Sequence, residues 1–298
     1  MADYLIRAID KDMKLKITTA VTTELVSVAS KAHETSATAS AALGRALTAT
    51  TMMSTNLKND QDIMTMIIDG GGTIGKIVTV ANNKGEVKGY VSNPTADAPS
   101  KHEGKLDVGA IVGRNGSVQV IMDLGLKEPY VGQAPLISGE IAEDIANFFY
   151  ISDQINSAVG LGVLVDVDLS IIAAGGFIIQ LLPGVEEADI VRLEETLSKI
   201  TSVTQMITDN LTPEDMLNEL LPGYELDILE KTELEFKCNC SKEKIKDLIL
   251  SLGREEIENM IEEDKGAEVV CQFCNTAYQF NEDELREILE TIVDDEEK

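Results

Sequence analysis

All four cysteines of this chain fall in two close pairs near its C-terminal end, Cys238-x-Cys240 and Cys271-x-x-Cys274. Thirty residues separate the two pairs, and both histidines lie far away in the first part of the chain. Two such pairs can place four thiolates around one tetrahedral Zn²⁺. The sequence therefore predicts an all-sulfur zinc site, and it limits how the surrounding residues can fold.

The segment that carries these cysteines, residues 233–298, has few apolar residues with which to build a core. One helical stripe ends at Gly253, and a second helix begins with a capping-box pattern at Asn281. The apolar positions of the two stripes are Ile245, Leu248, Ile249, Leu252, Leu285, Ile288, Leu289 and Ile292. Because so few residues bury little apolar surface, we expect a small C-terminal zinc-binding module that needs its metal to fold.

The spacing of the cysteines leaves two interpretations open, a purely structural zinc site and a redox switch. A C-x-C pair favours the switch, because a disulfide across one residue closes a small strained ring that is easily reduced. A thioredoxin-type role for Cys271 and Cys274 is disfavoured, since the pair lacks a βαβ setting. Isolated buried cysteines would not cluster in pairs in a polar segment.

The charge of the chain is strongly acidic and unevenly distributed, with a formal net charge of −27. Residues 184–298 contain 32 acidic and 11 basic residues, a net charge of −21, whereas residues 1–183 contain 20 and 14. Nucleic acids and anionic membranes attract basic surfaces, so we expect neither as a partner. No signal peptide and no apolar stretch near the ~18 residues of a membrane span is present, so we expect a soluble cytoplasmic protein with reduced thiols.

Residues 1–183 combine period-two and helical patterns, which predicts an α+β domain with largely antiparallel sheets. The expected helices are residues 23–58 and 140–151. The expected strands are residues 4–9, 14–20, 63–68, 76–81, 86–92, 117–124, 132–137, 158–165 and 171–182.

A helical connector is expected over residues 184–232, after the break at Pro183-Gly184. Thr212-Pro213 is typical of a helix start, with a capping hydroxyl followed by proline at the first helical position. Pro222-Gly223 stops this helix. The expected domains are thus residues 1–183, 184–232 and 233–298.

One glycine-rich segment resembles a phosphate-binding loop, namely residues 70–76. The next position should be Ser or Thr to hold Mg²⁺, but it is Ile77, and residues 76–80 have the pattern of a strand. We therefore expect a turn between two strands and no bound nucleotide. Two lone histidines and scattered carboxylates form no acid–base or nucleophilic set, so the chain is not expected to be an enzyme.

The order of several motifs resembles that of the redox-regulated bacterial heat-shock chaperones, the heat-shock protein 33 or 33 kDa chaperonin family. The resemblance covers nearly the whole chain and shows no departure at the cysteines. The motifs are residues 43–47 (LGRAL), 85–91 (GEVKGYV), Asn93-Pro94, 175–184 (GGFIIQLLPG), 236–241 (FKCNCS), 271–274 (CQFC) and Tyr278.

This resemblance implies a molecular chaperone that holds unfolding or oxidatively damaged proteins without ATP, with residues 1–183 as its client-binding core domain. Its reduced form would bind zinc through Cys238, Cys240, Cys271 and Cys274 and be inactive. Oxidative stress would form the Cys238–Cys240 and Cys271–Cys274 disulfides, release zinc, and loosen the module and the connector. The active form would tend to be a homodimer. The alternatives are a structural zinc interaction module without switching, and a thiol oxidoreductase.

Overall fold

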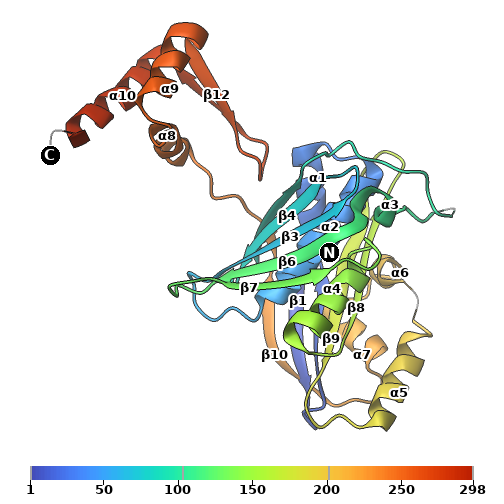
Figure 1. Cartoon of the computed structure of the whole chain (residues 1–298). Helices are drawn as coiled ribbons and strands as arrows, with labels where there is room; N and C mark the ends of the chain where they lie inside the picture. Colours follow the sequence, from blue (N-terminus) through green and yellow to red (C-terminus); the bar gives the residue numbers. More distant parts are fainter. Residues whose placement is uncertain (1, 103, 201, 297–298) are drawn as a thin grey trace. The chain divides into compact units, whose positions relative to one another are not determined.

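The computed structural model describes residues 2–102, 104–200 and 202–296, and it divides into two compact units (Figure 1). The first unit is Met1–Lys237 and the second is Cys238–Lys298. Residues 184–232 group with the first unit, and the three-part division expected from the sequence stays a prediction. Within the described ranges, no helix is both long enough and apolar enough to cross a lipid bilayer.

Two sheets form the first unit, and all but one of their strand pairs are antiparallel, which confirms the α+β class. The five-stranded sheet has the order β10(Leu226–Glu233), β1(Tyr4–Asp10), β2(Leu15–Val21), β9(Ile171–Leu181), β8(Ser157–Val165). The six-stranded sheet has the order β11(Glu235–Phe236), β5(Glu86–Val91), β4(Lys76–Asn82), β3(Ile63–Gly71), β6(Gly113–Asp123), β7(Tyr130–Pro135). The exception is the parallel pair of β11 and β5.

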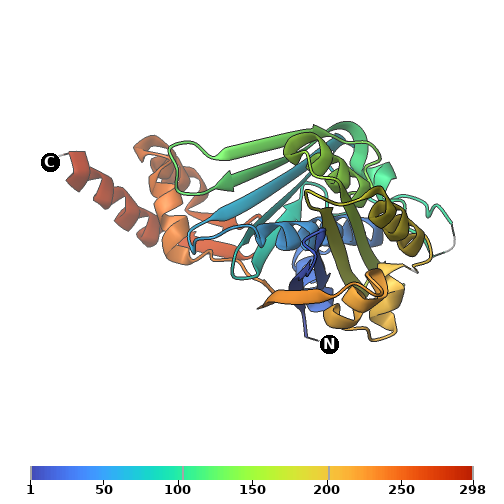
Figure 2. The ribbon, with the colours of Figure 1, turned by 90° about the horizontal axis from the view of Figure 1, so that it is seen from below.

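A buried helix, α2(Ala37–Ser54), lies between the two sheets and contacts β3, β4 and β5 on one side and β8 and β9 on the other (Figure 2). The expected single helix over residues 23–58 is wrong in one respect. The segment forms two helices, because α1(Thr23–His33) ends before α2 begins. Glu34 adopts a left-handed conformation, and the Ser36 side chain then accepts a hydrogen bond from the Ala39 N–H. This break lets the chain turn so that α2 can enter the space between the sheets.

Two helices of the expected connector, α6(Val203–Thr208) and α7(Pro213–Leu220), pack on the outer face of the five-stranded sheet. A third helix, α5(Glu187–Leu197), adds Leu193 to the same apolar cluster. Thr212 caps α7, because its Oγ1 accepts from the Asp215 N–H at 3.2 Å, as the sequence predicts. The last part of the connector differs from the expectation, since Leu226–Glu233 forms β10 and pairs with β1. The open edge of β1 offers unpaired main-chain groups, and pairing with them outweighs local helical preference.

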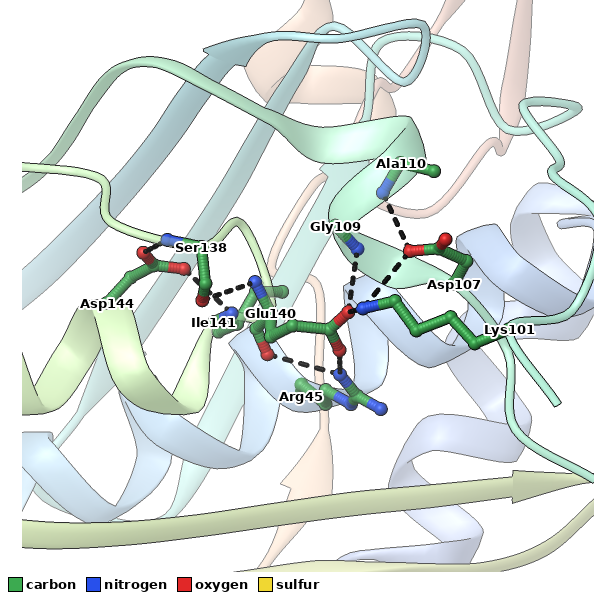
Figure 3. Close-up of polar contacts among 9 residues, drawn as sticks. All are labelled: Arg45, Lys101, Asp107, Gly109, Ala110, Ser138, Glu140, Ile141 and Asp144. Carbon is green, nitrogen blue, oxygen red and sulfur yellow. Dashed lines mark hydrogen bonds and ion pairs between the residues drawn. The ribbon is translucent and has the colours of Figure 1, made fainter.

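The segment expected to be helical over residues 140–151 forms α4(Ala142–Phe148), followed by the π-helical turn η1(Phe149–Asp153). The buried Asp144 carboxylate organises its start by accepting the backbone N–H groups of Ser138 and Ile141 at 3.0 and 2.9 Å (Figure 3). It also accepts the Ile137 N–H at 2.8 Å. These bonds satisfy donors at the helix N-terminus and hold the preceding loop.

A half-buried ion-pair cluster ties α2 to two loops of the first unit (Figure 3). The Glu140 carboxylate accepts from Arg45 Nη1 at 2.8 Å, from Lys101 Nζ, and from the Gly109 N–H at 3.2 Å. Asp107 pairs with Lys101 at 3.3 Å and accepts the Ala110 N–H at the start of α3(Val108–Val112). The cluster is internal to the fold, with every member engaged by another.

The glycine-rich segment 70–76 is a turn between two antiparallel strands, as the sequence predicts. A Cβ on Gly72 would lie 2.1 Å from the carbonyl oxygen of Ile111, and Gly75 has a φ of +69°. Close backbone approach and a left-handed turn residue therefore explain these glycines. Lys76 begins β4, so no helix N-terminus follows the turn.

Over residues 238–296, the second unit contains three helices, a π-helical turn and a two-stranded hairpin. Its elements are α8(Lys242–Leu250), α9(Arg254–Asn259), η2(Met260–Asp264), β12(Gly266–Val270), β13(Ala277–Asn281) and α10(Glu282–Glu296). The predicted capping box is present, because Asn281 Oδ1 accepts the Glu284 N–H at 2.9 Å and Glu284 accepts the Asn281 N–H at 3.1 Å. Its core is small and consists of Ile245, Ile249, Ile257, Ile261, Phe280, Leu285 and Ile288.

Candidate metal centre

The four cysteine sulfurs converge in the second unit, with all Sγ atoms within 4.8 Å of one another. The Sγ atoms of Cys238 and Cys271 are 3.7 Å apart, and those of Cys240 and Cys274 are 3.4 Å apart. In the described part of the chain, this is the only group of three or more Cys, His, Asp or Glu side chains found with ligand atoms close enough to share a metal ion. The four residues singled out from the sequence are thus brought together.

The first pair lies in an extended segment that runs from β11 to α8. Ser241 follows Cys240 directly and caps α8, since its Oγ accepts the Lys244 N–H at 3.3 Å. Lys244 also donates from Nζ to the Asn239 carbonyl oxygen at 2.7 Å. The cap and this bond hold the Cys-x-Cys segment at the start of the helix.

The second pair lies in the tight turn between β12 and β13. The Cys271 N–H donates to the Thr276 carbonyl oxygen at 2.9 Å, and the Asn275 N–H donates to the Cys271 carbonyl oxygen at 2.7 Å. Asn275 has a φ of 57°, a left-handed value that asparagine tolerates. The hairpin therefore fixes the separation of Cys271 and Cys274 through main-chain bonds.

The sulfur positions fit a tetrahedral metal ion. Zinc–sulfur bonds of about 2.3 Å in tetrahedral geometry place the sulfurs about 3.8 Å apart. The two short sulfur separations of 3.4 and 3.7 Å and the 4.8 Å limit bracket that value. All four cysteines are half-buried. Four soft thiolate donors in this geometry could hold Zn²⁺.

Neighbouring polar groups and burial set the protonation of the sulfurs. Burial raises the pKa of Cys238 to about 12 and also raises the pKa of Cys271. Burial opposes ionisation of Cys274 as well, but hydrogen bonds with Thr276 and the neighbouring thiols lower its pKa to about 7. Because these thiols lie so close together, a divalent cation among them would strongly favour the deprotonated forms.

Tyr278 and Thr276 contact the sulfurs in ways that the sequence reasoning missed. The Tyr278 hydroxyl donates to Cys240 Sγ at 3.1 Å, and Cys274 Sγ and Thr276 Oγ1 lie within hydrogen-bond distance at 3.2 Å. The bond to Cys240 raises the pKa of Tyr278 to about 12. Both contacts depend on the hairpin. Tyr278 is one of the motif residues, but the motif predicts no contact with a sulfur, and Thr276 has no separate signal in the sequence.

These features define a two-unit protein, with antiparallel sheets around a buried helix in one unit and a small four-cysteine, metal-capable module in the other. The model of the Hsp33 protein family matches residues 3–281. The chain belongs to this family, whose members are non-enzymatic molecular chaperones.

Individual relatives match over nearly their whole length. The 33 kDa chaperonin of Thermoanaerobacter sp. (strain X514) is 48% identical over 289 residues, which cover 97% of this chain and 98% of that protein. The 33 kDa chaperonin of Staphylococcus aureus (strain Newman) is 47% identical over 290 residues, covering 97% and 99%. The crystal structure of the heat shock protein 33 homolog from Thermotoga maritima has a TM-score of 0.91 at 35% identity, covering 99% of this chain and 100% of that one.

Proposed function

We propose that this chaperone is a redox-regulated, ATP-independent holdase of the cytoplasm, which prevents aggregation of unfolding and oxidatively damaged proteins. The convergence of four Sγ atoms within 4.8 Å carries the proposal. Thiols this close can either share one metal ion or form disulfides with little movement of the chain. A chaperone with this arrangement can therefore respond to an oxidant through its own side chains.

In the reduced state, Cys238, Cys240, Cys271 and Cys274 would hold zinc and the protein would be inactive. The ion would supply a cross-link between the β12–β13 turn and the segment before α8. That cross-link matters because, among the side chains that the structure describes, the core of the second unit contains seven buried apolar ones, too few to stabilise a module of this size strongly. Ligation and folding of the second unit are thus coupled.

Oxidation would join Cys238 to Cys240 and Cys271 to Cys274. Each disulfide forms when two thiols lose two electrons and two protons to the oxidant, and hydrogen peroxide is reduced to two molecules of water in the process. The close sulfur contacts of Cys238 with Cys271 and of Cys240 with Cys274 link one pair to the other, so they do not select this pairing. The pairing is supported by the resemblance to the family and by the closeness of all four sulfurs. Once paired, these cysteines offer no thiolate to a metal.

Loss of the cross-link would loosen the second unit, and the connector helices would loosen with it. In the first unit, α6 and α7 cover apolar side chains on the outer face of the five-stranded sheet, including Ile17, Phe177 and Ile179. Uncovering this face would expose apolar surface to which unfolding proteins bind without ATP. We propose that the active form is a homodimer.

The test is to add hydrogen peroxide to the reduced, zinc-loaded protein, and to follow released zinc, the free-thiol count and light scattering of an unfolding client. Zinc release, loss of four thiols and suppressed aggregation only after oxidation are expected. Proteolysis and mass spectrometry then identify the disulfides. Zinc retained under peroxide, with equal activity before and after, would favour a structural zinc module without switching. Turnover of a disulfide substrate would favour a thiol oxidoreductase.

A further inference from the structure

The strand β8 forms one edge of the five-stranded sheet, and it contains no charged residue over the nine residues Ser157–Val165 (Figure 1). The opposite edge of the same sheet is β10, which carries four charged side chains. They are Asp227, Glu230, Lys231 and Glu233. Charges on an edge strand discourage pairing with another chain, and their absence leaves the edge open to it. The two edges of this sheet thus differ in their number of charged residues, and so in how readily another strand could pair with them.

The register of β8 with β9 identifies the main-chain groups that face outward. The Leu181 N–H donates to the Asn156 carbonyl oxygen at 3.0 Å, and Ser157 lies opposite Gln180. In an antiparallel pair, bonding to the partner alternates along the strand. The N–H and C=O groups of Val159, Leu161 and Val163 therefore point away from β9. In the described residues, these outward groups have no hydrogen-bond partner.

The edges of the six-stranded sheet are protected in other ways. Along β7, Asn147 Nδ2 donates to the Pro135 carbonyl oxygen at 2.9 Å, and Tyr130 bonds to Asp153 at 3.2 Å, so α4 and η1 cover that edge. The other edge, β11, is only two residues long. Long strands that are open and uncharged at an edge are ready templates for an additional strand. Helix α4 also packs against β8, but no hydrogen bond joins them in the described residues. Of the sheet edges in the described first unit, β8 alone combines length, lack of charge and outward main-chain groups without a hydrogen-bond partner.

A mostly apolar groove of about 640 Å³ begins beside the first residues of β8. It is lined by Ala158, Ile179 and Leu181 of the sheet, by Leu193 and Leu197 of α5, and by residues of α4. The groove therefore offers apolar contacts next to the open hydrogen-bonding edge. An extended chain that pairs with β8 could place an apolar side chain in it.

We propose that the outer edge of β8 is a docking site for an extended, uncharged apolar segment of an unfolded client, which adds to the sheet as a sixth strand. Only an extended main chain matches a row of alternating N–H and C=O groups, and the lack of charge on β8 favours a segment that is also uncharged. Such segments are those that aggregate when exposed. Main-chain hydrogen bonds do not depend on client sequence, as a holdase with many clients requires. This inference rests on the proposed holdase function.

The decisive measurement is residue-resolved amide hydrogen exchange of the oxidised full-length chain. The probe is a short peptide of alternating Thr and Val with a Lys at each end. Bound peptide should slow exchange at Val159, Leu161 and Val163 at least about tenfold, and should leave the amides of β10 unchanged. The same peptide with alternate amides N-methylated on the pairing edge should have no effect. Peptide binding without slower exchange at β8 would overturn the proposal.

A pair of variants separates the hydrogen bond from side-chain packing. Val159→Pro removes one outward N–H at an edge position that tolerates proline, whereas Val159→Ala removes side-chain volume and keeps the N–H. The proline variant should bind the peptide about 2- to 10-fold more weakly than the alanine variant, the range for one main-chain hydrogen bond. Equal affinities would contradict the proposal. If Val159→Pro does not fold, the exchange measurement on the unsubstituted chain decides alone.

Two further outcomes have distinct meanings. If the β8 amides are already protected without peptide and sedimentation shows a dimer, a second copy of the chain occupies the edge and the client proposal is wrong. If the oxidised chain suppresses client aggregation but no probe protects β8, the docking site is wrong and the holdase function stands. If the oxidised chain fails to suppress aggregation, the holdase function is wrong, whatever β8 binds.

Discussion

Replacing Cys271 with Ser tests whether the four sulfurs act as one metal site. Cys271 Sγ lies 3.7 Å from Cys238 Sγ within a cluster whose Sγ atoms are all within 4.8 Å. Structural zinc contributes roughly 10–16 kcal/mol in small modules, so an equal share for one of four ligands is about 2.5–4 kcal/mol. This corresponds to roughly 10²- to 10³-fold weaker zinc binding. A core as small as that of the second unit supplies at most about 3–5 kcal/mol, so the loss brings it close to unfolding.

Zinc affinity is measured by competition with a chromophoric chelator, and folding by hydrogen exchange of the same sample under zinc-limited conditions. Residues 238–296 should lose protection, while the first unit keeps it. Val270→Ser is the matched control, because it introduces serine beside the site at an exposed position. A zinc affinity of Cys271→Ser within about threefold of the unsubstituted protein would refute the reasoning, as would equal loss of protection in the first unit.

Glu140→Gln leaves Arg45 without its carboxylate, and we expect the free energy of unfolding in urea, followed by circular dichroism, to fall by about 2–4 kcal/mol. Burial by itself would raise the pKa of the Glu140 carboxyl, but hydrogen bonds from Lys101 and Arg45 outweigh burial and lower this pKa. The contribution of Glu140 to the free energy of unfolding should therefore be complete above its unfolded pKa of about 4.3 and be lost as the pH falls below that value. A difference between Glu140→Gln and the unsubstituted protein that does not change with pH would contradict this. Burial raises the pKa of Asp3 to about 6. The folded chain thus keeps this proton longer, and the free energy of unfolding should fall as pH rises from about 4 to about 6. Asp3→Asn should flatten that slope, and an unchanged slope in pH-dependent denaturation would exclude Asp3 as its cause.

Much of the first unit could be predicted because burial follows the local sequence. In β4 the apolar residues Ile77 and Ala81 are buried and alternate with half-exposed positions, as a strand packed on one face requires. The Thr212-Pro213 helix start was visible for a similar reason, since a cap involves residues only three apart. Such features need no knowledge of distant parts of the chain.

Other features depend on partners far away in the sequence. Residues 226–233 become a strand because β1, more than two hundred residues earlier, offers an edge. The hairpin of β12 and β13 was missed because its strands are short and its turn is shaped by contacts around the cysteines. The break between α1 and α2 had a local signal in Ser36, a good capping residue. The reason for this break becomes clear only from the tertiary structure, in which α2 lies between the two sheets.

The sequence by itself determined that the candidate metal donors are thiols and that they lie in two close pairs along the chain. It also predicts that a module with so few apolar residues needs a metal to fold. Tertiary structure alone decided that four sulfurs meet within 4.8 Å, because a hairpin and a capped helix must converge to bring them there. It also decided which strand edge stays open. β8 is apolar like many buried strands, and only the strand order reveals that no other strand of the described residues pairs with its outer edge. Local sequence encodes chemistry and periodicity, whereas proximity and exposure arise from the packing of distant segments.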